Sequence, residues 1–137
     1  MKFFGARYVV FAVFCAFLAA GCSTIKEAAR GVIGVSTKEV EASRGEALSR
    51  QFDYSYKDCY DKTLKVLREI GAYVYTQDPK KKMIALYVSE IDTTVAGVFF
   101  KEVDASHTQV EVASPSSYAK DLIAAKLFSG LEAKQQQ

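Results

Sequence analysis

Residues 72–113 read AYVYTQDPKKKMIALYVSEIDTTVAGVFFKEVDASHTQVEVA, and this stretch sets the architecture of the chain. It contains four apolar or alternating runs, separated by turn-forming residues such as Asp78-Pro79-Lys80-Lys81-Lys82 and Asp104-Ala105-Ser106-His107. We expect strands over residues 72–77, 83–91, 94–103 and 108–113. Because the connections are short, these strands are expected to pair as an antiparallel meander.

A helix is predicted immediately before this stretch, over residues 55–70 (SYKDCYDKTLKVLREI). Its less polar side chains recur at steps of three and four and so share one face: Tyr56, Cys59, Thr63, Val66, Leu67 and Ile70. Ser55 with Asp58 resembles a capping box at its start, and Gly71 stands where a helix C-cap belongs.

A second helix is expected after the strands, from about Ser117 to Leu131, and the run Ser114-Pro115-Ser116-Ser117 before it offers an N-cap. Its apolar stripe consists of Ala119, Leu122, Ile123, Leu127, Gly130 and Leu131. Loose alternation over residues 48–54 indicates an opening strand. The order β-α-β-β-β-β-α predicts an α+β fold, with a four- to five-stranded antiparallel sheet and two helices on one face.

The first 21 residues have the composition of an export signal, with two cationic residues followed by an apolar run at 8–18. They lead into Leu18-Ala19-Ala20-Gly21-Cys22, which resembles the lipobox of bacterial lipoproteins with its leucine one place further back than is commonest. The resemblance implies cleavage between Gly21 and Cys22. It also implies a diacylglycerol on Cys22 and a fatty acyl group such as palmitate on the new amino terminus.

Two other interpretations of this segment stay open: an uncleaved membrane anchor, and a secretory signal with an incidental cysteine. Residues 8–21 would reach roughly 21 Å as a helix, whereas a membrane span needs about 20 residues to cross about 30 Å. The length favours a cleaved signal. Ser23 follows the cysteine where an aspartate would, in the best-studied bacteria, argue for inner-membrane retention. The resemblance therefore points to the periplasmic face of an outer membrane.

The charge balance argues against a nucleic-acid partner. The chain of 137 residues carries a formal net charge of +2, and both Lys2 and Arg7 lie in the signal, which has no acidic residue. The mature net charge is therefore zero, and no basic stripe remains of the kind that binds nucleic acid. We expect a signal at residues 1–21, a lipidated tether at 22–47 and one α+β domain at 48–137.

The tether allows two arrangements. Its glycines suit a spacer that holds the domain off the membrane, whereas the apolar residues Val32, Ile33 and Val35 suit a segment that folds back onto the sheet. Ser36-Thr37-Lys38-Glu39 resembles a capping box, which predicts a short helix up to about Ala47. The sequence does not decide between a spacer and a folded-back segment.

Few residues indicate chemistry. Cys59 lies on the apolar helix face, which favours an inert core thiol over a reactive one. His107 is expected to be a solvated turn residue, and Lys80-Lys81-Lys82 a charged hairpin tip rather than a lipid-headgroup site. Four acidic residues stand at strand ends and could form either a weak cation site or a solvated set: Glu90, Asp92, Glu102 and Asp104. We expect the solvated set, no metal, no cofactor and no enzymatic activity.

One feature suggests a binding surface. Strand alternation places Tyr73 and Tyr75 on one side of their strand, where Tyr87 and either Phe99 or Phe100 can join them. Aromatic side chains aligned on an open sheet face would form a partner or ligand surface. The simpler interpretation, which we favour, is that they pack beneath the N-terminal segment or fill a two-sided core.

In its order of elements, the mature region resembles small uncharacterised lipoproteins in which a compact β-α-β-β-β-β-α domain follows a lipobox. The resemblance covers roughly residues 48–131, is architectural, and carries over no catalytic residue. Two functions remain. The first is a non-catalytic structural or interaction module that is anchored in the envelope by its lipid and docks on an envelope protein. The alternative is a periplasmic module that binds a small ligand or a lipid between the sheet and the helices.

Overall fold

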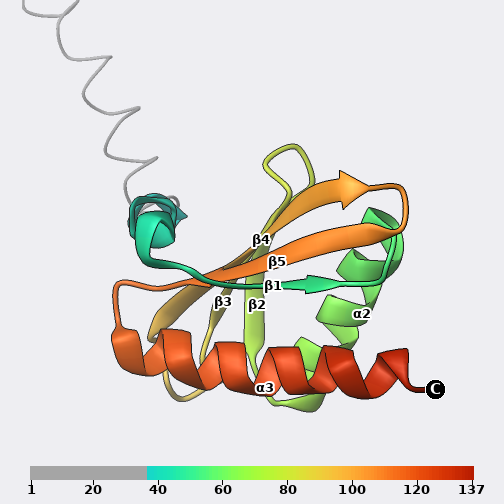
Figure 1. Cartoon of the computed structure of the whole chain (residues 1–137). Helices are drawn as coiled ribbons and strands as arrows, with labels where there is room; N and C mark the ends of the chain where they lie inside the picture. The colour runs from blue at the N-terminus through green and yellow to red at the C-terminus, as the bar shows by residue number, and fades with distance from the viewer. Residues whose placement is uncertain (1–36) are drawn as a thin grey trace, which may run out of the picture. The chain divides into compact units, whose positions relative to one another are not determined.

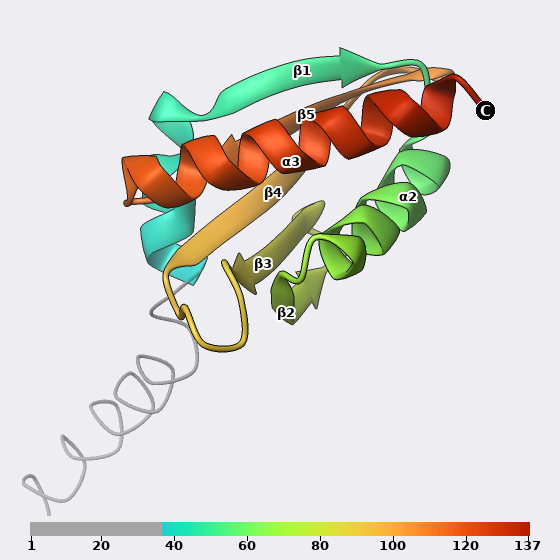
Figure 2. The same cartoon turned by 90° about the horizontal axis from the view of Figure 1, so that it is seen from below.

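The computed structural model describes residues 37–137. Five strands form one antiparallel sheet in the order β1-β5-β4-β3-β2. Their bounds are β1 (Leu48–Phe52), β2 (Tyr73–Asp78), β3 (Met83–Tyr87), β4 (Val95–Asp104) and β5 (His107–Ala113). Two long helices, α2 (Tyr56–Glu69) and α3 (Ser117–Gln135), cover the same face of this sheet (Figure 1, Figure 2). The predicted α+β fold, with its β-α-β-β-β-β-α order, is confirmed.

The main core fills the space between the sheet and these two helices. Alternate residues of the central strands point into it, because side chains along a strand alternate between its two faces. The buried cluster contains Ile84 and Leu86 from β3, Ala96, Val98 and Phe100 from β4, Val110 and Val112 from β5, and the apolar faces of α2 and α3. The apolar face predicted for α2 is the face that packs, with Cys59, Thr63, Val66 and Leu67 buried.

Both ends of α2 are formed as the sequence indicated. The Ser55 side chain accepts a hydrogen bond from the Asp58 backbone N–H at 3.3 Å. At the other end Gly71 has φ +79°, a conformation that glycine adopts without steric cost. The Gly71 N–H donates to the Arg68 carbonyl at 3.1 Å and the Ala72 N–H to the Leu67 carbonyl at 2.9 Å, which is a Schellman motif. The chain therefore turns sharply into β2.

Helix α3 is longer than expected and buries more of its surface. It continues to Gln135 rather than ending near Leu131. Ala124 and Phe128 are buried in addition to most of the predicted stripe, whereas Leu122 is only half-buried. The difference arises because α3 packs against both the sheet and α2, so its buried surface is wider than one stripe.

Strand β3 is shorter than predicted. It ends at Tyr87 rather than Ile91, because a tight turn begins two residues later, where the Ser89 N–H donates to the Asp92 carbonyl at 3.1 Å. The Asp92 carboxylate in turn accepts hydrogen bonds from the backbone N–H and the hydroxyl of Thr94. These bonds take residues 88–94 out of the sheet and form an ordered loop.

A short segment lies on the sheet face opposite the two long helices. Residues 37–42 are helical and continue into η1 (Ser43–Glu46), and we call residues 37–47 the covering segment. Its Val40 is fully buried in a second, smaller cluster with Met83, Ala85, Phe99 and Ala113. The predicted short helix is present. This segment packs against the sheet through Val40 and, in part, Ala47.

Candidate functional site: an aromatic surface at the β2 edge

The three tyrosines singled out in the sequence lie together on the face that carries the covering segment. Tyr73 pairs directly with Tyr87 in the β2–β3 register, and their rings stack at 6.1 Å between centroids. Tyr75 stacks on Tyr87 at 4.5 Å. The result is a row of three rings in the order Tyr73, Tyr87, Tyr75, which we call the tyrosine row.

A β-bulge in β2 falls at Tyr75. The pairing with β3 shifts between Val74 and Thr76, so Tyr75 is the extra residue. The shift also turns Gln77 toward α2, where the Tyr60 hydroxyl donates to its side-chain oxygen at 3.2 Å. Strict alternation would have placed Gln77 on the same side as Tyr75. No sequence signal indicated this bulge.

The tyrosine row runs from the interior to solvent. Tyr75 is half-buried and packs against the smaller cluster, whereas Tyr73 is 47% exposed. Phe99 belongs to that buried cluster, where it lies beneath Val40, and Phe100 points to the other face against Tyr56 and Tyr60. Phe99 is therefore part of a core on the second face of the sheet, as the interpretation of a two-sided core predicts. The Tyr73 end of the row is exposed to solvent.

The covering segment is held in place by charges as well as by Val40. Arg44 lies over the Phe99 ring at 4.6 Å and pairs with Glu111 at 2.7 Å. Lys81 pairs with Glu41 at 2.8 Å, which joins the segment to the β2–β3 turn. The apolar residues Val32, Ile33 and Val35, which the sequence allows to fold back onto the sheet, lie outside the described residues.

A surface hollow of about 570 Å³ adjoins the exposed end of the tyrosine row. It is lined by the end of α2, the start of β2 and the β3–β4 loop: Arg68, Gly71, Ala72, Tyr73, Ser89, Glu90 and Ile91. Ile91 is 96% exposed, although it is a large aliphatic residue. Sequence reasoning missed this hollow, because it assigned residues 88–91 to a strand.

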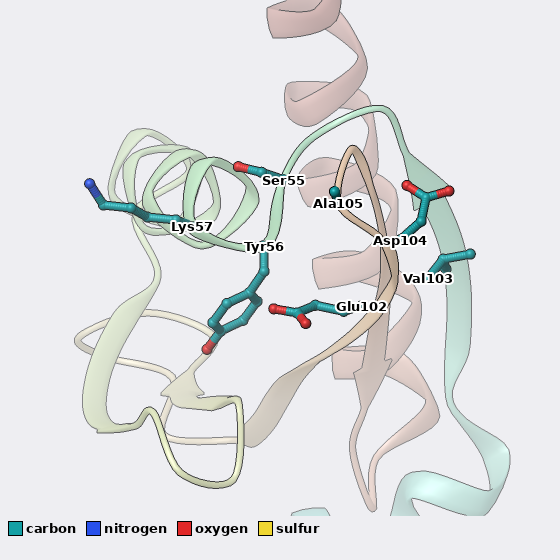
Figure 3. A pocket seen from close by; sticks show the side chains of 7 residues that line it. All are labelled: Ser55, Tyr56, Lys57, Glu102, Val103, Asp104 and Ala105. Atoms are coloured by element: carbon teal, nitrogen blue, oxygen red, sulfur yellow. The ribbon is translucent and has the colours of Figure 1, made fainter.

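A second hollow, of about 500 Å³, lies between the start of α2 and the β4–β5 turn (Figure 3). Tyr56 and Glu102 point toward each other there, while Lys57 points away. Burial, and then the Glu102 charge, raises the pKa of Tyr56. Glu102 pairs with Lys82 at 3.6 Å, and Ser55 caps α2. Glu102 and Ser55 thus have structural partners, an ion pair and a helix cap.

His107 opens β5 and lies between two carboxylates. Its Nδ1 is 2.7 Å from Asp104 Oδ1 and its Nε2 is 3.4 Å from Asp53 Oδ1. The hydrogen bond with Asp104, aided by the charges of Asp104 and Asp53, raises the pKa of His107 above its ordinary value. His107 is thus half-exposed and is the first residue of β5, rather than part of the turn as predicted, and it has two carboxylate partners.

The four acidic residues considered as a cation site do not come together. In the antiparallel β3–β4 pairing Tyr87 opposes Val95 and Met83 opposes Phe99. The loop that holds Glu90 and Asp92 joins the strands at the Tyr87–Val95 end, and β4 runs away from that end. Glu102 and Asp104 therefore lie at the other end of the sheet. Within residues 37–137, no group of three or more His, Cys, Asp or Glu residues could hold a metal ion.

The remaining residues discussed in the sequence have structural roles or lie outside the described part of the chain. Cys59 is fully buried, and burial raises the pKa of its thiol to about 12, so it is a core residue as predicted. The turn at residues 78–82 is confirmed, with the Asp78 side chain accepting hydrogen bonds from the N–H groups of Lys80 and Lys81. Gly21 and Cys22 lie outside the described residues. In the part of the chain that is described, no helix is long and apolar enough to cross a membrane.

Comparison with known proteins adds no functional information to this geometry. No model of a known protein family matches the chain, and no curated protein matches it.

Proposed function

We propose that this protein is a lipid-anchored envelope protein whose α+β domain acts as a non-catalytic docking module for another protein. Attachment would use Cys22, at the end of the lipobox-like run. Several acyl chains on one residue anchor a protein firmly, because each buried methylene contributes about 0.8 kcal/mol. On this proposal the protein faces the periplasm from the outer membrane.

The observation that carries the docking role is the tyrosine row. Its inner end is part of the packed core, which fixes the row rigidly, while Tyr73 is 47% exposed at its outer end. Tyrosine is enriched among the residues that dominate binding energy at protein interfaces. A rigid aromatic residue also loses little conformational entropy when it is buried by a partner. By contrast, the space between the sheet and the two long helices is filled by core side chains, which gives less support to a ligand-binding module.

Docking is tested by placing a photo-crosslinking amino acid at position 73 in the native, lipidated protein. Position 118 is the matched control, because Tyr118 is also an exposed tyrosine, at 60%, but lies on α3. A discrete protein adduct from position 73 and none from position 118 is expected. Adducts of equal yield from both positions, or none from position 73, would contradict the proposal.

Anchoring is tested separately by the substitution Cys22→Ser. The variant should appear in the soluble fraction or remain as unprocessed precursor, whereas the unaltered protein sediments with membranes. Membrane attachment and processing that do not change in Cys22→Ser would refute the lipobox interpretation. The docking surface would still be tested independently by the crosslinking experiment at position 73.

A further inference from the structure

The hollow beside Tyr73 is bounded by two rigid pieces of backbone. On one side, the Schellman motif at the end of α2 fixes Gly71 and Ala72. On the other, the β3–β4 loop is closed by two backbone hydrogen bonds, from Val88 N–H to the Thr94 carbonyl and from Ser89 N–H to the Asp92 carbonyl, both 3.1 Å. A surface formed by fixed backbone binds a partner with little ordering entropy.

The same hollow contains a protruding side chain and a recess. Ile91, at 96% exposure, lines the hollow from the loop, while the small residues Gly71 and Ala72 line it after α2, where a Cβ added at Gly71 would meet nothing within 4 Å. The exposed Tyr73 lines the same hollow, so two large side chains with apolar surface are available to a partner there. The protrusion and the recess come from one molecule and lie side by side.

The charged residues around the hollow also form a complementary pair. Arg68 and Glu90 both line it and both are exposed. Within residues 37–137, neither of them takes part in an ion pair. One patch thus carries a cation with its complementary anion, and a protrusion with its complementary recess. A two-fold contact brings the same patch of both copies face to face, so each half of these pairs can meet its complement on the other copy.

We infer that this end of the sheet is a two-fold contact with a second copy of this chain. Ile91 of each copy enters the recess at Gly71 and Ala72 of the other, and Arg68 of each copy faces Glu90 of the other. The inference rests on the proposed function, because it names the partner of the surface that includes Tyr73. Tethering to one membrane would favour such a contact by raising the effective concentration of the copies.

A lipid surface fits this patch less well than a second copy does. Glu90 and Asp92 flank Ile91 in the loop, and their carboxylates would be repelled by anionic headgroups. Insertion of Ile91 into a bilayer would also bring the charged side chain of Glu90 to the membrane. The membrane is therefore an outcome that the experiment distinguishes.

The test is the self-association of the full-length lipidated protein in detergent, measured by sedimentation over a range of concentrations. A monomer–dimer equilibrium is expected. Arg68→Glu and Glu90→Arg should each weaken the dimer by about tenfold or more, because each change places like charges opposite each other twice in a two-fold contact. The double variant Arg68→Glu/Glu90→Arg should restore the dimer, which a folding defect would not do. Ile91→Ser should weaken it, and Tyr118→Ser, on α3, should have no effect.

The outcomes separate this inference from the proposed function. A protein that is monomeric at every concentration, or a double variant that does not recover, overturns the second copy as partner. If position 73 still crosslinks to a different protein, docking stands and only the partner is wrong. If Ile91→Ser lowers binding of Cys22→Ser protein to phosphatidylethanolamine–phosphatidylglycerol vesicles and leaves sedimentation unchanged, the loop contacts membrane and the inference is overturned.

Discussion

At the scale of single residues, burial and local partners decide which polar side chains are available for chemistry. Cys59 has the nucleophilic atom of a reactive thiol, but burial raises its pKa to about 12, so the thiolate is scarce near neutral pH. His107 is accessible, yet its Nδ1 faces Asp104 at 2.7 Å and its Nε2 faces Asp53. Its accessible charge is thus used to join the β4–β5 turn to the chain after β1.

His107 predicts a pH dependence of stability. Because its pKa is raised in the folded protein, its contribution is fully present below about pH 6.5 and is lost as the pH rises through the raised pKa. Asp104 has a lowered pKa, so its contribution is lost as the pH falls below about 3.8. In urea unfolding, His107→Gln should remove part of the decline in stability that sets in as the pH rises above about 6.5. An identical pH profile in the two proteins would show that the pair contributes nothing.

At the scale of elements, two glycines mark places where backbones approach too closely for a side chain. A Cβ at Gly130 of α3 would lie 2.5 Å from Val66 Cγ1 of α2. A Cβ at Gly97 of β4 would overlap Val40 of the covering segment. Each glycine therefore sets how closely one element packs on another, which is a role that the apolar pattern alone does not reveal.

The α2–α3 contact gives the second prediction. Gly130→Ala should lower the free energy of unfolding by about 1–3 kcal/mol, because the new methyl group overpacks the contact with Val66. Combining it with Val66→Ala should cost less than the sum of the two single changes, since the smaller side chain makes room for the methyl group. Denaturant unfolding of all four proteins measures the coupling. Strict additivity would contradict the close approach of the two helices.

The covering segment gives the third prediction. Gly97→Ala should displace Val40 and speed amide hydrogen exchange over residues 37–47, while exchange in α2 and α3 changes little. Gly45→Ala is the control in the segment itself, because a Cβ there meets nothing within 4 Å. Unchanged exchange over residues 37–47 in Gly97→Ala would mean that Val40 does not pack on Gly97.

At the scale of the whole molecule, the sheet separates two apolar clusters of unequal size. The larger lies under α2 and α3, and the smaller lies under the covering segment, where Val40 meets Met83, Ala85 and Phe99. Because the larger cluster does not include the covering segment, the main fold should tolerate its loss. The smaller cluster should not remain shielded from water without it.

The fourth prediction compares two truncated chains, residues 36–137 and residues 48–137. Both should give the circular dichroism of an α+β protein, but the shorter one should bind more of a hydrophobic dye and unfold at lower denaturant, since Met83 and Phe99 lose their cover. If the shorter chain is unfolded, the covering segment is required for the fold. If both chains bind dye equally, it does not shield the sheet.

Much of the fold and part of the site could be predicted, because they depend on local patterns. The face of α2, the cap at Ser55 and the turn at Gly71 follow from residues within one or two helical turns, and alternation placed Tyr73 and Tyr75 on one side. The acidic residues show the limit of this approach: Glu90 and Glu102 both stand at strand ends in the sequence, but the antiparallel pairing puts them at opposite ends of the sheet.

The sequence by itself determined the element order, the buried helix face and the pairing of consecutive strands, because these are set by hydrophobic periodicity and short turns. Only the tertiary structure decided that β1 pairs with β5, that a bulge at Tyr75 turns Gln77 toward α2, and that Ile91 lines a hollow with Gly71 and Ala72. The strand order, the bulge and the hollow depend on contacts between residues far apart in the chain and on exact strand register. No local pattern encodes either, and the docking surface arises from both.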